Sequence, residues 1–159
     1  MLAAYLALDR KHAKIQINDY FGAIYLTSRD GLVGFWKESA MLDAFARTAC
    51  DLGHPPWFYW IEFHHALKKK TYGDGMLMPY SKELASIFLH ATRLAHEASR
   101  ATKAKAEVRV EHFVISVAAH KQVEFARRLV TSGLDLKKLH KTIGRNGAKQ
   151  MTLSTPLSE

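Results

Sequence analysis

The sequence contains a single cysteine, Cys50, among its 159 residues. One thiol excludes an internal disulfide framework and a metal cluster built from cysteines, and it suits a reducing compartment. No apolar run approaches the roughly 20 residues needed to cross a bilayer. Residues 1–8 are apolar, but they lack a basic leader and are too short for a secretory signal. These absences predict a cytoplasmic protein with no membrane partner.

Motifs of catalysis and metal binding are also missing. The nine histidines include no His-Glu-x-x-His pattern. The neighbours His64 and His65 point apart on a helix, and His112 and His120 are separated by roughly two helical turns. Residues 144–147 lack the Lys-Ser/Thr pair and the preceding strand of a phosphate-binding loop. We therefore expect no metal, no cofactor and no enzymatic activity in this chain.

Acidic residues are fewer than basic ones, 15 against 23, which leaves a net charge of +8. This surplus favours acidic protein surfaces, nucleic acid or anionic lipid as partners. The candidate basic patch consists of Lys68, Lys69, Lys70, Lys137, Lys138, Lys141 and Arg145. Such a patch can contact nucleic acid, although a solvated surface is the simpler interpretation. Residues 145–159 are predicted to form a flexible basic tail.

Residues 1–34 allow two interpretations. A short helix is expected near Leu2–Leu6. Residues 14–18 alternate like a strand and, with residues 23–26, could form a small hairpin. Asn18 or Asp19 could instead cap a helix. We favour the helical interpretation because the rest of the chain is helical, and the hairpin stays open.

Two helices are predicted in residues 35–79, separated by Gly53 and the Pro55-Pro56 pair and followed by a linker. The apolar face of the first is expected at Ala40, Met41, Ala44, Phe45, Thr48, Ala49 and Leu52. The second is marked by Trp57, Trp60, Ile61, His64 and Leu67. It opens with four aromatic residues, which cannot all share one face. Either the helix is covered on both sides, or Trp57, Tyr59 and Trp60 border a partner-binding groove.

Residues 80–144 predict four helices with one core. Ser81 is placed to cap the first, which carries a continuous apolar stripe. The run from Phe113 to Ala119 is apolar or small, so the second helix should be central. Gly133 suits the left-handed position after the third helix, and Asp135 can cap the fourth. A compact all-α bundle is the expected fold.

The segment resembles one repeat of the Clp N-terminal domain, which precedes the ATPase rings of Clp-type AAA+ unfoldases. The family's central helix opens with Glu-His-Leu-Leu, and here the sequence reads Glu111-His112-Phe113-Val114. Its closing Gly, apolar residue and Asp match Gly133-Leu134-Asp135. The family usually has two tandem repeats. Residues 35–79 are therefore either a degenerate first repeat or an unrelated element packed on a single repeat.

The resemblance implies a non-catalytic domain that recognises protein substrates or adaptors. The ATPase would lie elsewhere in the full-length protein or on another chain. In some family members the hydroxyl before the first helix and the Glu of the central helix bind phosphorylated arginine, which implies Ser81 and Glu111 as protein-binding residues. Helix capping alone also explains both. The alternative function is a basic helical domain that binds nucleic acid.

Overall fold

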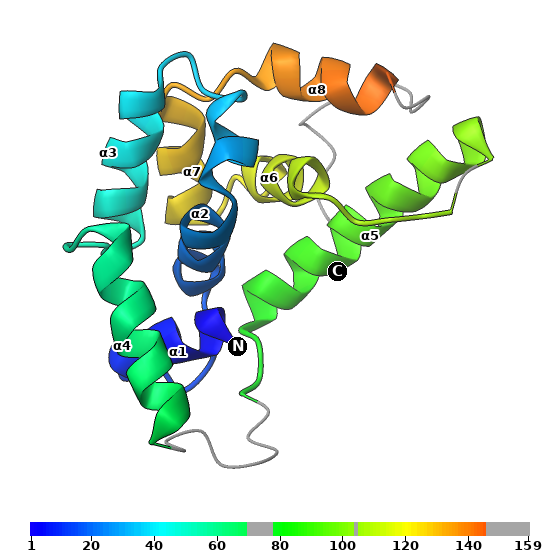
Figure 1. Ribbon diagram of the computed structural model, residues 1–159. Coiled ribbons are helices and arrows are strands. Elements are labelled where there is room, and N and C mark those ends of the chain that lie inside the picture. Colours follow the sequence, from blue (N-terminus) through cyan, green and yellow to red (C-terminus); the bar gives the residue numbers. More distant parts are fainter. Residues whose placement is uncertain (70–77, 104, 146–159) are drawn as a thin grey trace.

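The computed structural model describes residues 1–69, 78–103 and 105–145. Within these ranges the chain forms eight helices and no extended strand (Figure 1). The first four are α1 (Leu2–Asp9), α2 (Ile17–Val33), α3 (Ser39–Ala49) and α4 (Pro56–Lys68). The second four are α5 (Lys82–Thr102), α6 (Val110–Ala119), α7 (Glu124–Thr131) and α8 (Leu136–Arg145). The all-helical prediction is confirmed, and no helix in these ranges could span a membrane.

The small hairpin considered for residues 1–34 does not form. Ile15 is extended and pairs with the segment before α5: its N–H donates to Pro79 O, and its carbonyl accepts from Ser81 N–H, both at 2.9 Å. α2 then begins at Ile17, and the Asp19 carboxylate accepts the Gln16 N–H at 2.9 Å. This side chain satisfies an amide that the first helical turn leaves unpaired, which favours the helix over the hairpin.

α2 bends at Ser28, whose backbone is not helical (φ −140°, ψ 34°). Beyond the bend, Arg29 donates from Nε and Nη2 to the two carboxylate oxygens of Asp43, each at 2.7 Å. Tyr25 donates its hydroxyl to the same carboxylate at 2.7 Å. This fork joins both legs of α2 to α3.

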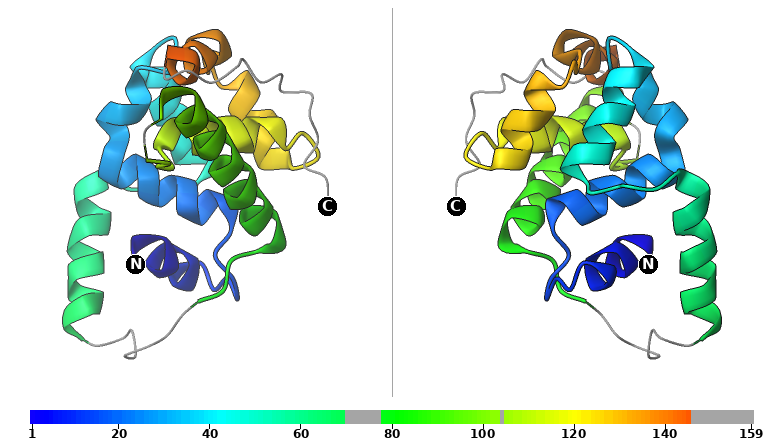
Figure 2. Two further views of the ribbon diagram at one scale, coloured as in Figure 1. Left: turned by 90° about the vertical axis from the view of Figure 1, so that its right-hand side faces the viewer. Right: turned by 90° about the vertical axis from the view of Figure 1, so that its left-hand side faces the viewer.

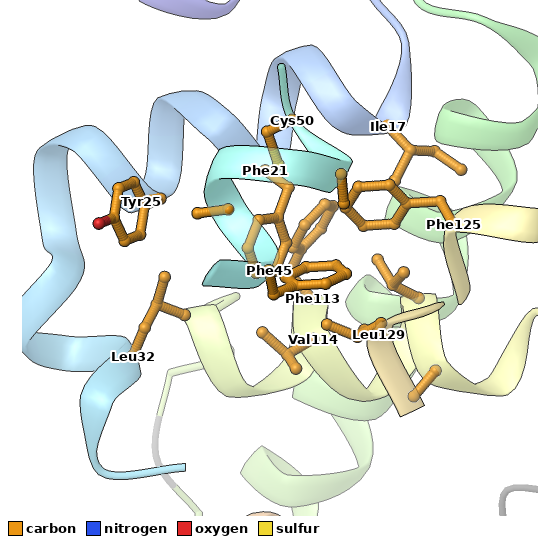
Figure 3. Packing of buried hydrophobic residues seen from close by; sticks show 14 of the residues in the cluster. Ile17, Phe21, Tyr25, Leu32, Phe45, Cys50, Phe113, Val114, Phe125 and Leu129 are labelled. Atoms are coloured by element: carbon orange, nitrogen blue, oxygen red, sulfur yellow. The ribbon is translucent and has the colours of Figure 1, made fainter. Parts of the chain in front are cut away.

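The predicted central helix is indeed central, because every residue from His112 to Ala119 in α6 is buried. α6 packs against α5, α7, α8 and α2. Beside it four aromatic rings gather, Phe21, Phe45, Phe113 and Phe125 (Figure 3). The centroids of Phe21 and Phe45 are 5.5 Å apart, and those of Phe45 and Phe125 are 5.3 Å apart. Such ring pairs add to the stabilisation from burial itself.

The buried faces of α3 and α4 differ from those predicted. α3 buries Leu42, Phe45, Ala46 and Ala49, whereas Ala40, Met41 and Ala44 are exposed. α4 buries Tyr59 and Phe63, and Trp57 and Ile61 face outward. Both helices have apolar residues on more than one side. Tertiary contacts therefore choose the face, such as the edge contact of Phe63 with Tyr5 of α1 at 5.8 Å.

The two halves of the chain meet through equivalent positions. Asp19 is the third residue of α2, and His112 is the third residue of α6. Both side chains are buried, and each accepts a hydrogen bond from the N–H of the residue that precedes its helix. The next residues, Tyr20 and Phe113, contact each other with ring centroids 5.0 Å apart. Equivalent residues touch each other when two units are related by an approximate two-fold axis.

A second equivalent pair is Trp36 and Leu134, which precede α3 and α8 and form an isolated antiparallel bridge. Lys37 N–H donates to Gly133 O at 2.9 Å, and Asp135 N–H donates to Phe35 O at 2.7 Å. Exchanging the two halves maps each of these hydrogen bonds onto the other. The contacts at this place are therefore reciprocal between the two halves of the chain.

A buried ion pair ties together the ends of three helices. The Asp19 carboxylate has no exposed surface, and it accepts from Arg10 Nη1 at 2.7 Å and contacts His12 Nδ1 at 2.8 Å. Arg10 also donates to Cys50 O at the end of α3. Removing one member of such a network leaves the other charge buried without its partner.

We expect Asp19→Asn to destabilise the protein by about 3 kcal/mol, because the Arg10 guanidinium loses its counter-charge in a largely buried position. Urea denaturation followed by circular dichroism measures this loss. Asp30→Asn is the matched control, since the Asp30 carboxylate is fully exposed, and its effect should stay within about 0.5 kcal/mol. Similar losses in the two variants would contradict a structural role for the buried pair.

Candidate protein-binding surface

Ser81 and Glu111 have different environments. Ser81 is buried, and its Oγ accepts the Leu84 N–H at 3.2 Å, so the predicted helix cap is confirmed. Glu111 lies in the first turn of α6 with its side chain partly exposed. In the described part of the chain no hydrogen bond joins the two side chains. Ser81 therefore has a structural role as a helix cap. Of the two residues, Glu111 is the one whose side chain is accessible to a partner.

The aromatic cluster divides between core and surface. Tyr59 is only 6% exposed, and its hydroxyl lies 3.3 Å from His54 N and 3.5 Å from Asp51 O. Trp60 is partly buried, whereas Trp57 is 62% exposed. Ile61, one turn from Trp57, is also exposed. The structure therefore separates Tyr59 from the apolar face that α4 presents outward.

The candidate basic patch is not one surface. Lys68 and Lys69 lie at the C-terminal end of α4, and α8 carries Lys137, Lys138 and Lys141. α4 and α8 occupy opposite ends of the molecule in each view (Figures 1 and 2). Lys70 and the Arg145 side chain lie outside the described residues. The basic side chains thus form two separate groups.

A groove that the sequence did not predict lies between α3 and α7, with a volume of about 650 Å³. α3 and α7 are side by side in Figure 1 and in contact. Its apolar lining includes the buried Phe45 and Leu134 and the more exposed Met41 and Val130, each 39% exposed. The remaining lining residues are Lys37, Ala44, Thr48, Arg128, Thr131, Ser132 and Gly133. An apolar floor with a few polar groups is typical of a binding site.

Sequence reasoning missed this groove for a specific reason. Met41 was expected in the buried face of its helix, and its partners across the groove lie roughly ninety positions later in the chain. The available signal was the Ser132-Gly133-Leu134 segment, but it was interpreted only as a helix end. The groove appears when the two halves of the chain are brought together.

A second hollow, of about 360 Å³, lies between α1 and α4 and has the opposite charge. Its lining includes the carboxylates of Asp9, Asp51 and Glu62 and one cation, Arg10, so acidic groups predominate. Burial, and then the charges of Asp9 and Glu62, raise the pKa of Tyr5 in its wall. The protein therefore presents an acidic hollow near one end and a groove with only basic charges elsewhere.

Among the described residues, no group of three His, Cys, Asp or Glu side chains is placed to hold a metal ion. Cys50 is buried, and burial raises the pKa of its thiol, so the reactive thiolate is disfavoured.

No protein-family model, curated protein or solved structure matches the chain, so the candidate surfaces are defined by its own geometry.

Replacing Ser81 by alanine should cost about 1 kcal/mol of stability, because the Leu84 amide loses its acceptor at the start of α5. Thermal or urea denaturation measures the effect. Ser39→Ala is the control, since Ser39 begins α3 and is exposed. Equal effects of the two substitutions would show that the Ser81 cap contributes nothing to stability.

Stability should fall as the pH is lowered through the ordinary histidine pKa of about 6.5. Burial lowers the pKa values of His90, His112 and His140, so the folded state binds fewer protons than the unfolded state in this range. The free energy of unfolding therefore has its full value above a pH of about 6.5 and decreases as the pH falls below it. Urea midpoints measured on both sides of it test the prediction.

The loss of stability on lowering the pH should be smaller in His112→Asn. This substitution removes one of the three histidines but keeps a side chain able to cap α6. His65→Asn, on the exposed side of α4, is the control. A midpoint independent of pH, or higher in acid, would contradict the prediction.

Proposed function

We propose that this chain is a non-catalytic protein-binding domain with the two-repeat architecture of the Clp N-terminal family. It would recognise protein substrates or adaptors for an AAA+ unfoldase, which lies elsewhere in the full-length protein or on another chain. The observation that carries the proposal is the reciprocal pairing of residues 35–37 with residues 133–135. It links the two helical halves of the chain, and the resemblance implies two tandem repeats.

The order of elements supports this interpretation. In the second unit, α5 is followed by the central α6 and by the short α7 and α8. In the first unit, α1 is followed by α2 and then by α3. The bend at Ser28 divides α2 into two segments, so this unit also has four helical segments. The proposed first repeat is therefore residues 2–49, and α4 is an additional helix between the repeats. This differs from the degenerate repeat expected in residues 35–79.

The residue type differs between the two units at one position that matters for recognition. Asn18 precedes Asp19 in α2 as Glu111 precedes His112 in α6. An amide cannot hold a guanidinium group through a charged fork as a carboxylate can. Any recognition of phosphorylated arginine of the family type is therefore proposed for Glu111 alone, without a contribution from the Ser81 side chain.

The alternative function, nucleic-acid binding, has the net charge of +8 in its favour. Binding of this kind is expected to be independent of sequence and steeply weakened by salt. The separation of the lysines on α4 from those on α8 reduces the number of phosphates that one nucleic-acid segment could contact at once. Protein binding is therefore the preferred proposal.

The proposal predicts that the immobilised chain captures an AAA+ ATPase, its adaptor or a defined set of client proteins from lysate treated with nuclease. Because part of the contact is apolar, capture should persist in moderate salt, in contrast to attraction by charge alone. Mass spectrometry identifies the captured proteins. Trp57→Ala/Ile61→Ala tests the outward face of α4, and Leu89→Ala on α5 is the matched exposed control.

Each variant is checked by circular dichroism for unchanged helicity. If the chain captures only nucleic acid before nuclease treatment and nothing specific afterwards, the protein-binding proposal is wrong and the alternative replaces it. If capture is equal in all folded variants, the proposal stands but the α4 face is not the contact surface.

A further inference from the structure

We propose that the groove between α3 and α7 binds an acidic, apolar segment of a partner protein. This inference rests on the proposed protein-binding function and specifies the chemistry of the partner. Four features of the groove support it: a fixed floor, an adaptable apolar wall, two cations that form no ion pair among the described residues, and a lining without carboxylates.

The floor of the groove is held in place by the junction of the two halves. Trp36 Nε1 donates to Ser132 Oγ at 3.0 Å, and Lys37 N–H donates to Gly133 O at 2.9 Å. Phe45 and Leu134 are 5% and 6% exposed, so they form a packed apolar base. A preformed floor lowers the ordering cost of binding.

The wall at Met41 is both close and adaptable. The Met41 side chain occupies the space that a Cβ on Gly133 would need, and Gly133 has a φ of +91°. Glycine is therefore favoured there by its backbone conformation, and a Cβ at this position would displace the end of the Met41 side chain. Methionine has several rotatable bonds and a polarisable sulfur, which suit it to apolar side chains of varied shape. Met41 and Val130 give the groove an accessible apolar surface.

The charge of the groove selects the partner. Lys37 and Arg128 are the charged residues of its lining, both are exposed, and neither forms an ion pair within the described ranges. A carboxylate of the partner could pair with one of these cations while an apolar side chain next to it packs against Met41 and Val130. Charge complementarity of this kind speeds association and rejects partners of the wrong sign. A basic segment would instead favour the acidic hollow between α1 and α4.

The test uses the full chain and a fluorescein-labelled short peptide in which leucine alternates with glutamate. Fluorescence anisotropy measures its dissociation constant at several salt concentrations. Three matched peptides carry glutamine in place of glutamate, lysine in place of glutamate, or serine in place of leucine. We expect the acidic, leucine-containing peptide to bind at least about tenfold more tightly than each of the others.

Two substitutions in the groove carry the test. Arg128→Glu reverses a cation of the rim, and Val130→Asp places a carboxylate in the apolar wall; each should weaken binding of the acidic peptide at least about tenfold. The matched controls are Arg100→Glu and Leu89→Asp, which change exposed residues of α5 in the same ways and should bind like the unmodified chain. Circular dichroism and thermal melting verify that each variant is folded.

Several results would overturn the inference. These are no binding of the acidic peptide, equal binding by the groove variants and the controls, or equal binding of the peptide without leucine. Tighter binding of a single-stranded oligonucleotide that is lost in Arg128→Glu would assign the groove to nucleic acid instead. The capture experiment decides the broader proposal separately, since a partner retained by both groove variants would leave protein binding intact and exclude only this groove.

Discussion

The pairing of residues 35–37 with residues 133–135 sets the relation between the two halves of this protein. It consists of two reciprocal backbone hydrogen bonds, which contribute only about 1 kcal/mol each to net stability. Their main effect is geometric. α8 begins directly after residues 133–135 and α3 begins one residue beyond residues 35–37, so the junction lies at the start of both helices. The floor of the groove between α3 and α7 belongs to the same junction, and a shift there would change the candidate binding surface as well.

The packed core of the protein and its candidate contact surfaces lie in different places around this junction. The central α6 is buried from His112 to Ala119, and the aromatic rings beside it leave little freedom in the core. The outward face of α4, the groove and the acidic hollow lie on the periphery, with different charges and apolar content. A domain with a stiff core and several dissimilar surfaces can present more than one contact without rearrangement.

The second half of the chain was predictable because its signals are local. Ser81 and Asp135 cap helices through contacts within one turn, Gly133 has the left-handed backbone expected after a helix, and the α5 stripe repeats at helical spacing. Residues 1–34 were ambiguous because alternation over a few residues fits both a strand and a capped helix. The structure resolves the ambiguity at Asp19, which accepts the Gln16 N–H at the start of α2 and is buried against Arg10, a contact that no alternation pattern encodes. The phosphoarginine role implied by the resemblance stays a prediction, which we propose for Glu111 alone because the Ser81 hydroxyl caps α5.

By itself the sequence determined the helical class, most helix ends and the central position of α6, since spacing, caps and continuous apolar runs act within a few residues. Only the tertiary structure decided which faces of α3 and α4 are buried, because both helices carry apolar residues on several sides and their neighbours select among them. It also decided that Tyr59 is a core residue while Trp57 is exposed, and that the lysines of α4 and α8 lie apart. The groove depends on tertiary structure most of all. Its walls come from segments distant in sequence, and no local pattern specifies how two helices meet.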